Sequence, residues 1–182
     1  MKILAISDTH GKLNKVRDIW PKLTDIDMIL HAGDFIADAE KLQAELGVPV
    51  IGVKGNCDGG YSSSDFRVIP VECGNILLTH GHMENVNYQL NGLMYKAMEN
   101  DCRAVVFGHT HKAMTDESNG IRFINPGSLT QPRDGSDGSY AIIRTSADSF
   151  DASIVYYSTI IGNKKPPQSG FLRNLMNYCD RF

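Results

Sequence analysis

The chain has 182 residues, a net charge of −3 and an apolar fraction of 42%. A chain of this length buries roughly 70% of the surface that its unfolded form exposes, so it needs neither disulfides nor metal to hold a core. The charge gives no bulk attraction to nucleic acid, and the four cysteines form no Cys-x-x-Cys pair. We therefore expect one domain over residues 1–182, in which residues 162–182 form a tail of unassigned role.

The first residues enter a strand directly, without the basic region and small-residue cleavage site of a signal peptide. No apolar run approaches the roughly 20 residues that are needed to span a bilayer. We expect a cytoplasmic protein with free thiols and no membrane partner. The sequence leaves the oligomeric state open, a homo-oligomer included.

Three short apolar runs, at residues 3–6, 26–30 and 50–53, are expected to be buried strands. Apolar residues at helical spacing lie between these runs, and Pro21 and Gly47 are expected to mark the ends of the two helices. This β-α-β-α-β order predicts parallel strands with right-handed crossovers. In such sheets ligands bind outside the carboxyl ends of the strands.

The rest of the chain has a different pattern. Residues 66–71 and 76–79 are expected to form a hairpin with its turn at Gly74-Asn75, followed by a helix over residues 90–98 and a buried strand over residues 104–107. A meander of four strands is expected at residues 114–117, 121–125, 140–144 and 153–157. A short helix is expected from Phe171.

Seven side chains of metal-binding type fall at the ends of predicted strands, in five segments that each contain a glycine. They are Asp8, His10, Asp34, Asn56, His80, His109 and His111. Imidazole, carboxylate and carboxamide without thiolate suit a borderline divalent ion such as Mn, Fe, Ni or Zn. The glycines let the backbone approach such ions closely and permit unusual φ angles. Seven ligands are too many for one tetrahedral ion and suit two ions that share a carboxylate, which indicates a two-metal hydrolase.

Each of these segments alone is a common turn, and it is their conjunction that indicates a site. Two further histidines are left over. His31 is expected to be a packed histidine or one that supports a ligand. His82 either lines the substrate side of the site or is a half-exposed loop histidine.

The order Asp-x-His, Gly-Asp, Gly-Asn, His-Gly-His and Gly-His-Thr-His resembles the motifs of the calcineurin-like metallophosphoesterases, in particular their small bacterial and archaeal phosphodiesterases. The resemblance runs from Met1 to about Ser158. It implies an α/β fold, a four-layer α/β/β/α sandwich with two mixed β-sheets. It also implies two divalent metal ions as cofactors, with Mn expected and Fe, Ni or Zn as alternatives.

By the same resemblance, the first ion is held by Asp8, His10, Asp34 and His111, and the second by Asp34, Asn56, His80 and His109. Two divalent ions, two aspartates and a bridging hydroxide leave a charge of about +1, which complements a phosphodiester. The implied function is hydrolysis of small or nucleotide-like phosphodiesters by the bridging hydroxide, with Asp34, Asn56, Cys57 and His80 as catalytic residues.

Cys57 departs from a pattern of the wider superfamily. Many members carry His after the Gly-Asn pair, where it is thought to contact the phosphate and protonate the leaving group. The sequence has Cys57 there, followed by Asp58. Absence of the imidazole would weaken the reaction of a dianionic monoester more than that of a diester, so we expect a preference for diesters. The general acid stays unassigned.

Two other functions remain as alternatives. The same fold serves as a protein-interaction scaffold in a trafficking complex, although that scaffold has a degraded ligand set. A nuclease of the superfamily is the other alternative, but the chain shows no basic run with interleaved aromatics. The segment Asn125-Pro126-Gly127-Ser128 is expected to be a rigid turn, and Arg133 an exposed loop arginine rather than a phosphate contact.

Overall fold

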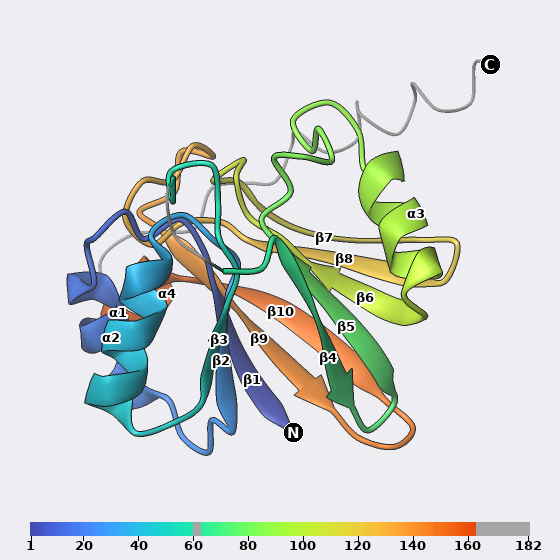
Figure 1. Cartoon of the computed structure of the whole chain (residues 1–182). Helices are drawn as coiled ribbons and strands as arrows, with labels where there is room; N and C mark the ends of the chain where they lie inside the picture. Colours follow the sequence, from blue (N-terminus) through green and yellow to red (C-terminus); the bar gives the residue numbers. More distant parts are fainter. Residues whose placement is uncertain (60–62, 163–182) are drawn as a thin grey trace.

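The computed structural model describes residues 1–59 and 63–162. Two five-stranded mixed sheets pack face to face, with three helices on the outer face of one sheet and a fourth helix on the outer face of the other (Figure 1). This arrangement confirms the predicted four-layer α/β/β/α sandwich. The short helix expected from Phe171, and residues 163–182 of the tail that contains it, lie outside the described residues.

The first sheet has the strand order β10-β9-β1-β2-β3. Its strands are β1 (Lys2–Ile6), β2 (Met28–His31), β3 (Val50–Gly52), β9 (Ser139–Thr145) and β10 (Phe150–Tyr156). The parallel strands β1, β2 and β3 are joined through α1 (Asn14–Ile19), the 3-10 helix η1 (Trp20–Lys22) and α2 (Ile36–Leu46). The predicted β-α-β-α-β unit is therefore present, with Gly47 in the left-handed conformation at the end of α2.

The second sheet has the strand order β4-β5-β6-β8-β7. Its strands are β4 (Phe66–Val71), β5 (Gly74–Thr79), β6 (Cys102–Val106), β7 (Ala113–Ser118) and β8 (Ile121–Pro126). Strands β5, β6 and β8 are parallel, and α3 (Asn91–Glu99) connects β5 to β6. The final helix of the described chain, α4 (Tyr157–Ile161), follows β10 and was not predicted.

The expected turn at Gly74-Asn75 is wrong by two residues. Gly74 pairs with Val71 in the β4–β5 ladder, so the turn consists of Glu72 and Cys73. A Cβ on Gly74 would meet the Cδ of Arg103 at 2.6 Å, and the Arg103 guanidinium donates to the Cys73 carbonyl at 2.8 Å. The glycine therefore makes room for an arginine and does not form the turn.

The expected four-strand meander is divided between the two sheets. The β7–β8 hairpin belongs to the second sheet and the β9–β10 hairpin to the first. Each hairpin is a local structure, but the sheet that it joins is set by long-range pairing, here of β8 with β6 and of β9 with β1.

The main core lies between the two sheets. Successive residues of β1 face opposite ways: Ile3 and Ala5 pack in the layer between the sheets, whereas Leu4 and Ile6 pack beneath the helices. Burial on both faces explains why the run is apolar without alternation. A third cluster, around Leu93, joins α3 to the second sheet. Over residues 1–59 and 63–162, no helix has the length and apolar character needed to cross a membrane.

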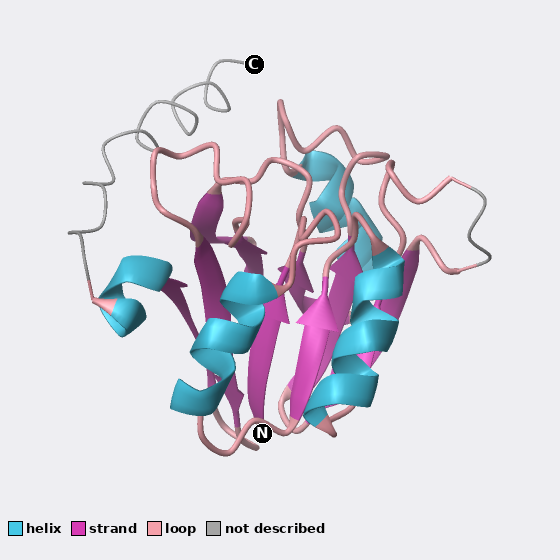
Figure 2. Cartoon of the chain, turned by 90° about the vertical axis from the view of Figure 1, so that its left-hand side faces the viewer, coloured by secondary structure: helices cyan, strands magenta, loops and turns pink. Residues whose placement is uncertain are grey.

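The carboxyl ends of the parallel strands of both sheets meet at one end of the sandwich. Loops gather there in Figure 2, and hydrogen bonds join them across the sheets. The Asp8 N–H donates to the Gly33 carbonyl at 3.0 Å within the first sheet, and the His109 N–H donates to Asp8 Oδ2 at 3.1 Å from the second. The packing of the sheets thus sets the distances between the loops.

Replacing Leu30 by Ala tests this core. Leu30 lies fully buried on β2 in the layer between the sheets, so Leu30→Ala should lower the free energy of unfolding by about 2–5 kcal/mol. Val68→Ala on the edge strand β4, where Val68 is 37% exposed, should cost much less. Urea unfolding curves measure both. Equal losses in the two variants would contradict the position of Leu30 in the core.

Candidate metal centre

Five of the seven candidate ligands have a left-handed backbone. Their φ angles are 55° at Asp8, 47° at His10, 56° at Asp34, 68° at His109 and 57° at His111. Such conformations cost of order 1–3 kcal/mol each and gather at functional sites. Unusual φ angles were expected at the glycines of these segments. Gly11, Gly33 and Gly81 have them, and the five ligands adopt them as well.

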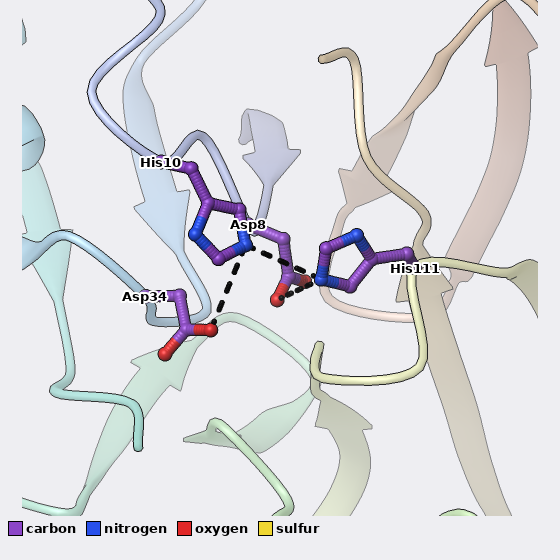
Figure 3. Close-up of side chains that lie close together, drawn as sticks. All are labelled: Asp8, His10, Asp34 and His111. Carbon is purple, nitrogen blue, oxygen red and sulfur yellow. Dashed lines mark hydrogen bonds and ion pairs between the residues drawn. The ribbon is translucent and has the colours of Figure 1, made fainter. Parts of the chain in front are cut away.

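Four candidates form one tight group at the end of the sandwich (Figure 3). Ligand atoms of Asp8, His10, Asp34 and His111 all lie within 4.8 Å of one another. His111 Nε2 is 3.3 Å from His10 Nε2 and 3.2 Å from Asp8 Oδ1. His10 Nε2 is 3.7 Å from Asp34 Oδ2. Two imidazoles and two carboxylates therefore face a common point.

The other three candidates form a second group, which approaches the opposite oxygen of Asp34 through His80. His80 Nε2 lies 3.4 Å from Asp34 Oδ1 and 3.1 Å from Asn56 Oδ1. Asn56 Oδ1 is also 3.0 Å from His109 Nδ1. All seven candidates thus lie together, and Asp34 directs one carboxylate oxygen toward each group.

The hydrogen bonds of His80 and His111 leave a lone pair of each ring aimed at the centre. His80 Nδ1 lies 2.8 Å from the Ala32 carbonyl and His111 Nδ1 lies 2.7 Å from the Gln131 carbonyl. A carbonyl only accepts, so each Nδ1 carries a proton, and Nε2 of the neutral ring is an acceptor. Among the described residues, the buried Asp8 Oδ1 has no partner with hydrogen-bond geometry, although His111 is close. Acceptors that face one another without donors fit a cation.

Within the first group, Asp8 and His111 shift the pKa of each other. Burial alone would raise the pKa of Asp8, but the hydrogen bond with His111, followed by the interactions with His80 and Ser7, outweighs it and lowers that pKa overall. Desolvation would lower the pKa of His111, but the interaction with Asp8 raises it overall. A divalent ion needs a neutral imidazole, so protonation of His111 and binding of the ion would exclude each other.

Glycines beside the ligands provide space. A Cβ on Gly33 would lie 2.6 Å from His80 Nδ1, and a Cβ on Gly55 or Gly108 would collide with Asp34 or Asp8. Of these three glycines only Gly33 has a left-handed φ, of 97°. The expected close approach of the backbone is therefore seen between these glycines and the side chains of neighbouring ligands.

The segment Asn125-Pro126-Gly127-Ser128 is not a turn throughout, since Asn125 and Pro126 are the last paired residues of β8. It supports two ligand loops. Asn125 Nδ2 donates to the Gly108 carbonyl at 2.9 Å and to Thr110 Oγ1 at 3.1 Å. Ser128 Oγ donates to the Asp8 carbonyl at 2.8 Å. Asn125 and Ser128 are both fully buried. Through these hydrogen bonds they connect the loop after β1 to the loop after β6.

The leftover histidines differ in position. His31 is fully buried, and its Nε2 lies 2.9 Å from Thr9 Oγ1 between two ligands, as a supporting histidine would. Burial lowers its pKa. His82 is partly buried, and its ring centre lies 5.3 Å from that of His80 and 6.2 Å from that of His109. His82 therefore flanks the group that contains Asn56.

Cys57 is exposed beside Asn56, and its backbone N–H donates to Asp34 Oδ1 at 3.0 Å. Partial desolvation, followed by the hydrogen bond with Asp34, raises the pKa of the thiol to about 11. The protein's own groups thus keep the thiol protonated at neutral pH. Arg133 is exposed, as expected, and its backbone N–H donates to the His111 carbonyl at 2.9 Å.

Several polar residues around the site were given no role by the sequence, among them Asp38, Asp58 and Asn87. Asp38 and Asp58 are buried carboxylates that accept hydrogen bonds from the ligand loops. Asn87 Nδ2 lies 3.0 Å from His109 Nε2. Asp58 directly follows Cys57 and could have been found from the motif, whereas the sequence around Asp38 and Asn87 gives no such signal.

Comparisons with known proteins agree with this geometry. Residues 1–148 match the family model of the calcineurin-like phosphoesterase superfamily domain. The chain is 32% identical to the probable metallophosphoesterase YsnB of Bacillus subtilis over 158 residues, which cover 86% of this chain and 90% of that protein. It is 27% identical to the phosphodiesterase YfcE of Escherichia coli K12 over 172 residues, which cover 79% and 87%.

Solved structures are also similar. A predicted phosphoesterase from Streptococcus pneumoniae TIGR4 superposes with a TM-score of 0.73 at 26% identity, covering 86% of this chain and 90% of that chain. The structure of the E. coli phosphoesterase YfcE gives a TM-score of 0.66 at 25% identity, covering 88% and 95%. The chain belongs to the calcineurin-like phosphoesterase superfamily, with the fold and a cluster of potential metal ligands in place, and it is a hydrolase.

Proposed function

We propose that the protein is a phosphodiesterase that uses two divalent metal ions to hydrolyse small or nucleotide-like phosphodiesters. The observation that carries the proposal is the position of Asp34, whose two carboxylate oxygens face separate groups of ligand atoms. A shared carboxylate is what a pair of neighbouring ions requires.

The proposed ligand sets follow the two groups. Asp8, His10, Asp34 and His111 would hold one ion, and Asp34, Asn56, His80 and His109 the other. Imidazole, carboxylate and amide oxygen suit Mn, which we take as the expected ion, with Fe, Ni or Zn as alternatives. Bound ions would supply a nucleophile derived from water and would polarise the phosphoryl oxygens.

The chain itself orients these groups and leaves one side accessible. Asp8, Asp34, His80 and His111 are buried, whereas Asn56 and Cys57 are exposed. A phosphate would therefore approach past Asn56 and Cys57. Asp34 is oriented by the Cys57 N–H and His80 by the Ala32 carbonyl. These contacts support catalytic roles for Asp34, Asn56, Cys57 and His80.

The choice of a diester rests on charge and on Cys57. With two divalent ions, Asp8, Asp34 and a hydroxide, the site would carry about +1, which matches one phosphodiester charge. Cys57 supplies a weak donor and no positive charge, so the second charge of a monoester would be poorly compensated. A relative of this chain, YfcE, is named a phosphodiesterase.

Turnover of bis(p-nitrophenyl) phosphate tests the function. With added Mn²⁺ the protein should release nitrophenol, and a chelator should abolish this release. Asp34→Asn should lower kcat/KM by more than about 100-fold, since even residues that only support ligands are worth 10–100-fold. Asp148→Asn, at an exposed position of the β9–β10 hairpin loop, is the matched control and should keep full activity.

Three results, from this assay and from two further experiments, would contradict the proposal. Absence of metal-dependent turnover, together with a stable partner in a pull-down experiment, would favour a scaffold. Salt-sensitive cleavage of single-stranded DNA, faster than cleavage of small diesters, would favour a nuclease. Equal activity of Asp34→Asn and Asp148→Asn would contradict the site itself.

Cys57→His tests the preference for diesters. An imidazole at this exposed position offers an N–H donor and a positive charge when it is protonated, which a monoester needs more than a diester does. The ratio of monoesterase to diesterase kcat/KM should rise several-fold, measured with p-nitrophenyl phosphate and its bis ester. Cys57→Ser is the control and should leave the ratio near its original value. An unchanged ratio in the histidine variant would refute the proposed role of Cys57.

A further inference from the structure

Two buried carboxylates beside the site are not candidate metal ligands. Asp38 lies in the first turn of α2 and is fully buried, and Asp58 follows β3 and is 7% exposed. A buried carboxylate is costly unless its oxygens accept hydrogen bonds or pair with a cation. The partners of these two residues therefore show what their charges stabilise.

Asp38 is bonded to the loop that carries Asp8 and His10. Its Oδ2 accepts from Thr9 Oγ1 at 2.8 Å and from the Gly11 N–H at 2.8 Å. Thr9 and Gly11 flank His10 on either side. The other oxygen, Oδ1, accepts only from Lys41 Nζ among the described residues, at 3.0 Å.

His31 extends this network under the loop. The Thr9 hydroxyl has a single proton, which it donates to Asp38, so it accepts from His31 Nε2 at 2.9 Å. His31, Thr9 and Asp38 are all buried. The loop is thus held from β2 on one side and from α2 on the other, between two ligands with left-handed backbones.

Asp58 is bonded to the segments that carry Asn56 and Asp34. Its Oδ2 accepts from the Gly55 N–H at 2.8 Å, immediately before Asn56. Its Oδ1 accepts from the Ile36 N–H at 2.9 Å, in the first turn of α2. Ile36 follows Asp34 and Phe35, two successive residues with φ angles of 56° and 72°.

We infer that Asp38 and Asp58 are positioning residues that act on different halves of the site: Asp38 orients the ligands from the loop after β1, and Asp58 orients Asn56 relative to Asp34. This inference rests on the two-ion function proposed above. Without Asp38, the Thr9 hydroxyl and Gly11 N–H lose their acceptor, and the strained backbone at Asp8 and His10 can relax. Without Asp58, the N–H groups of Gly55 and Ile36 lose their acceptor, so the segments that carry Asn56 and Asp34 are no longer held together.

Mn²⁺ binding to the full chain tests the division between the two halves. Calorimetric titration and the EPR signal of free Mn²⁺ count the bound ions and give their affinities. Each half is measured alone in a background variant: Asn56→Ala leaves the group of Asp8, His10 and His111, and His10→Ala leaves the group of Asn56, His80 and His109.

Asp38→Ala should weaken Mn²⁺ binding about 10–100-fold in the Asn56→Ala background and change it less than about 2-fold in the His10→Ala background. Asp58→Ala should show the reverse pattern. A role in folding alone would instead lower the unfolding temperature of both backgrounds without a change of affinity that depends on the background.

Two further variants of the same network act as controls. Lys41→Ala removes the ion pair with Oδ1, in which Lys41 is 56% exposed, and should leave Mn²⁺ affinity unchanged. Asp38→Asn keeps an oxygen that can accept from Thr9 and Gly11, so it should restore most of the affinity that Asp38→Ala loses. Should Asp38→Ala not fold, Asp38→Glu, which keeps the charge but shifts the carboxylate by one methylene, should give the same background-dependent loss.

The outcomes separate this inference from the function on which it rests. Fewer than two Mn²⁺ ions bound by the unmodified chain would overturn the two-ion proposal and the division with it. Two bound ions, but equal losses or no losses in both backgrounds, would overturn only the positioning roles of Asp38 and Asp58.

Discussion

The Asp34 carboxylate lies between imidazoles that come from different sheets. His10 follows β1 of the first sheet and approaches Oδ2 at 3.7 Å, whereas His80 follows β5 of the second sheet and approaches Oδ1 at 3.4 Å. The two groups of ligand atoms exist side by side only because the sheets pack through the apolar layer between them. The stability of that layer and the geometry of the site are therefore linked.

Backbone strain is concentrated at this end of the molecule. Five ligand residues adopt left-handed conformations, and the hydrogen bonds that hold them come from buried polar groups. Asp38, Asp58, Asn125 and Ser128 each bond the backbone of a ligand loop or a residue beside a ligand. A buried polar group that loses its partner costs about 1–3 kcal/mol, so the loops and their supports stabilise each other. These hydrogen bonds orient the ligand loops in the free protein, which favours a constant ligand geometry.

The sequence was most informative where a short motif lies at a position that the fold itself brings to the site. Strand ends next to glycine and a ligand-type residue could be predicted, because buried parallel strands are continuous apolar runs and their carboxyl ends share one edge. The turn before Gly74 was misplaced, since a glycine needed for Arg103 looks the same as a glycine needed for a turn. The division of the late strands between two sheets, and the supporting role of Asp38, depend on long-range contacts that no local pattern records.

The proposed function depends on two divalent ions that share the Asp34 carboxylate. Anomalous diffraction from crystals grown with Mn²⁺ would test it most directly, because the scattering locates each ion without reference to activity. Two peaks are expected, one beside Asp8, His10 and His111 and one beside Asn56, His80 and His109, with Asp34 between them. A single peak, or peaks that leave Asp34 outside the coordination of both ions, would contradict it.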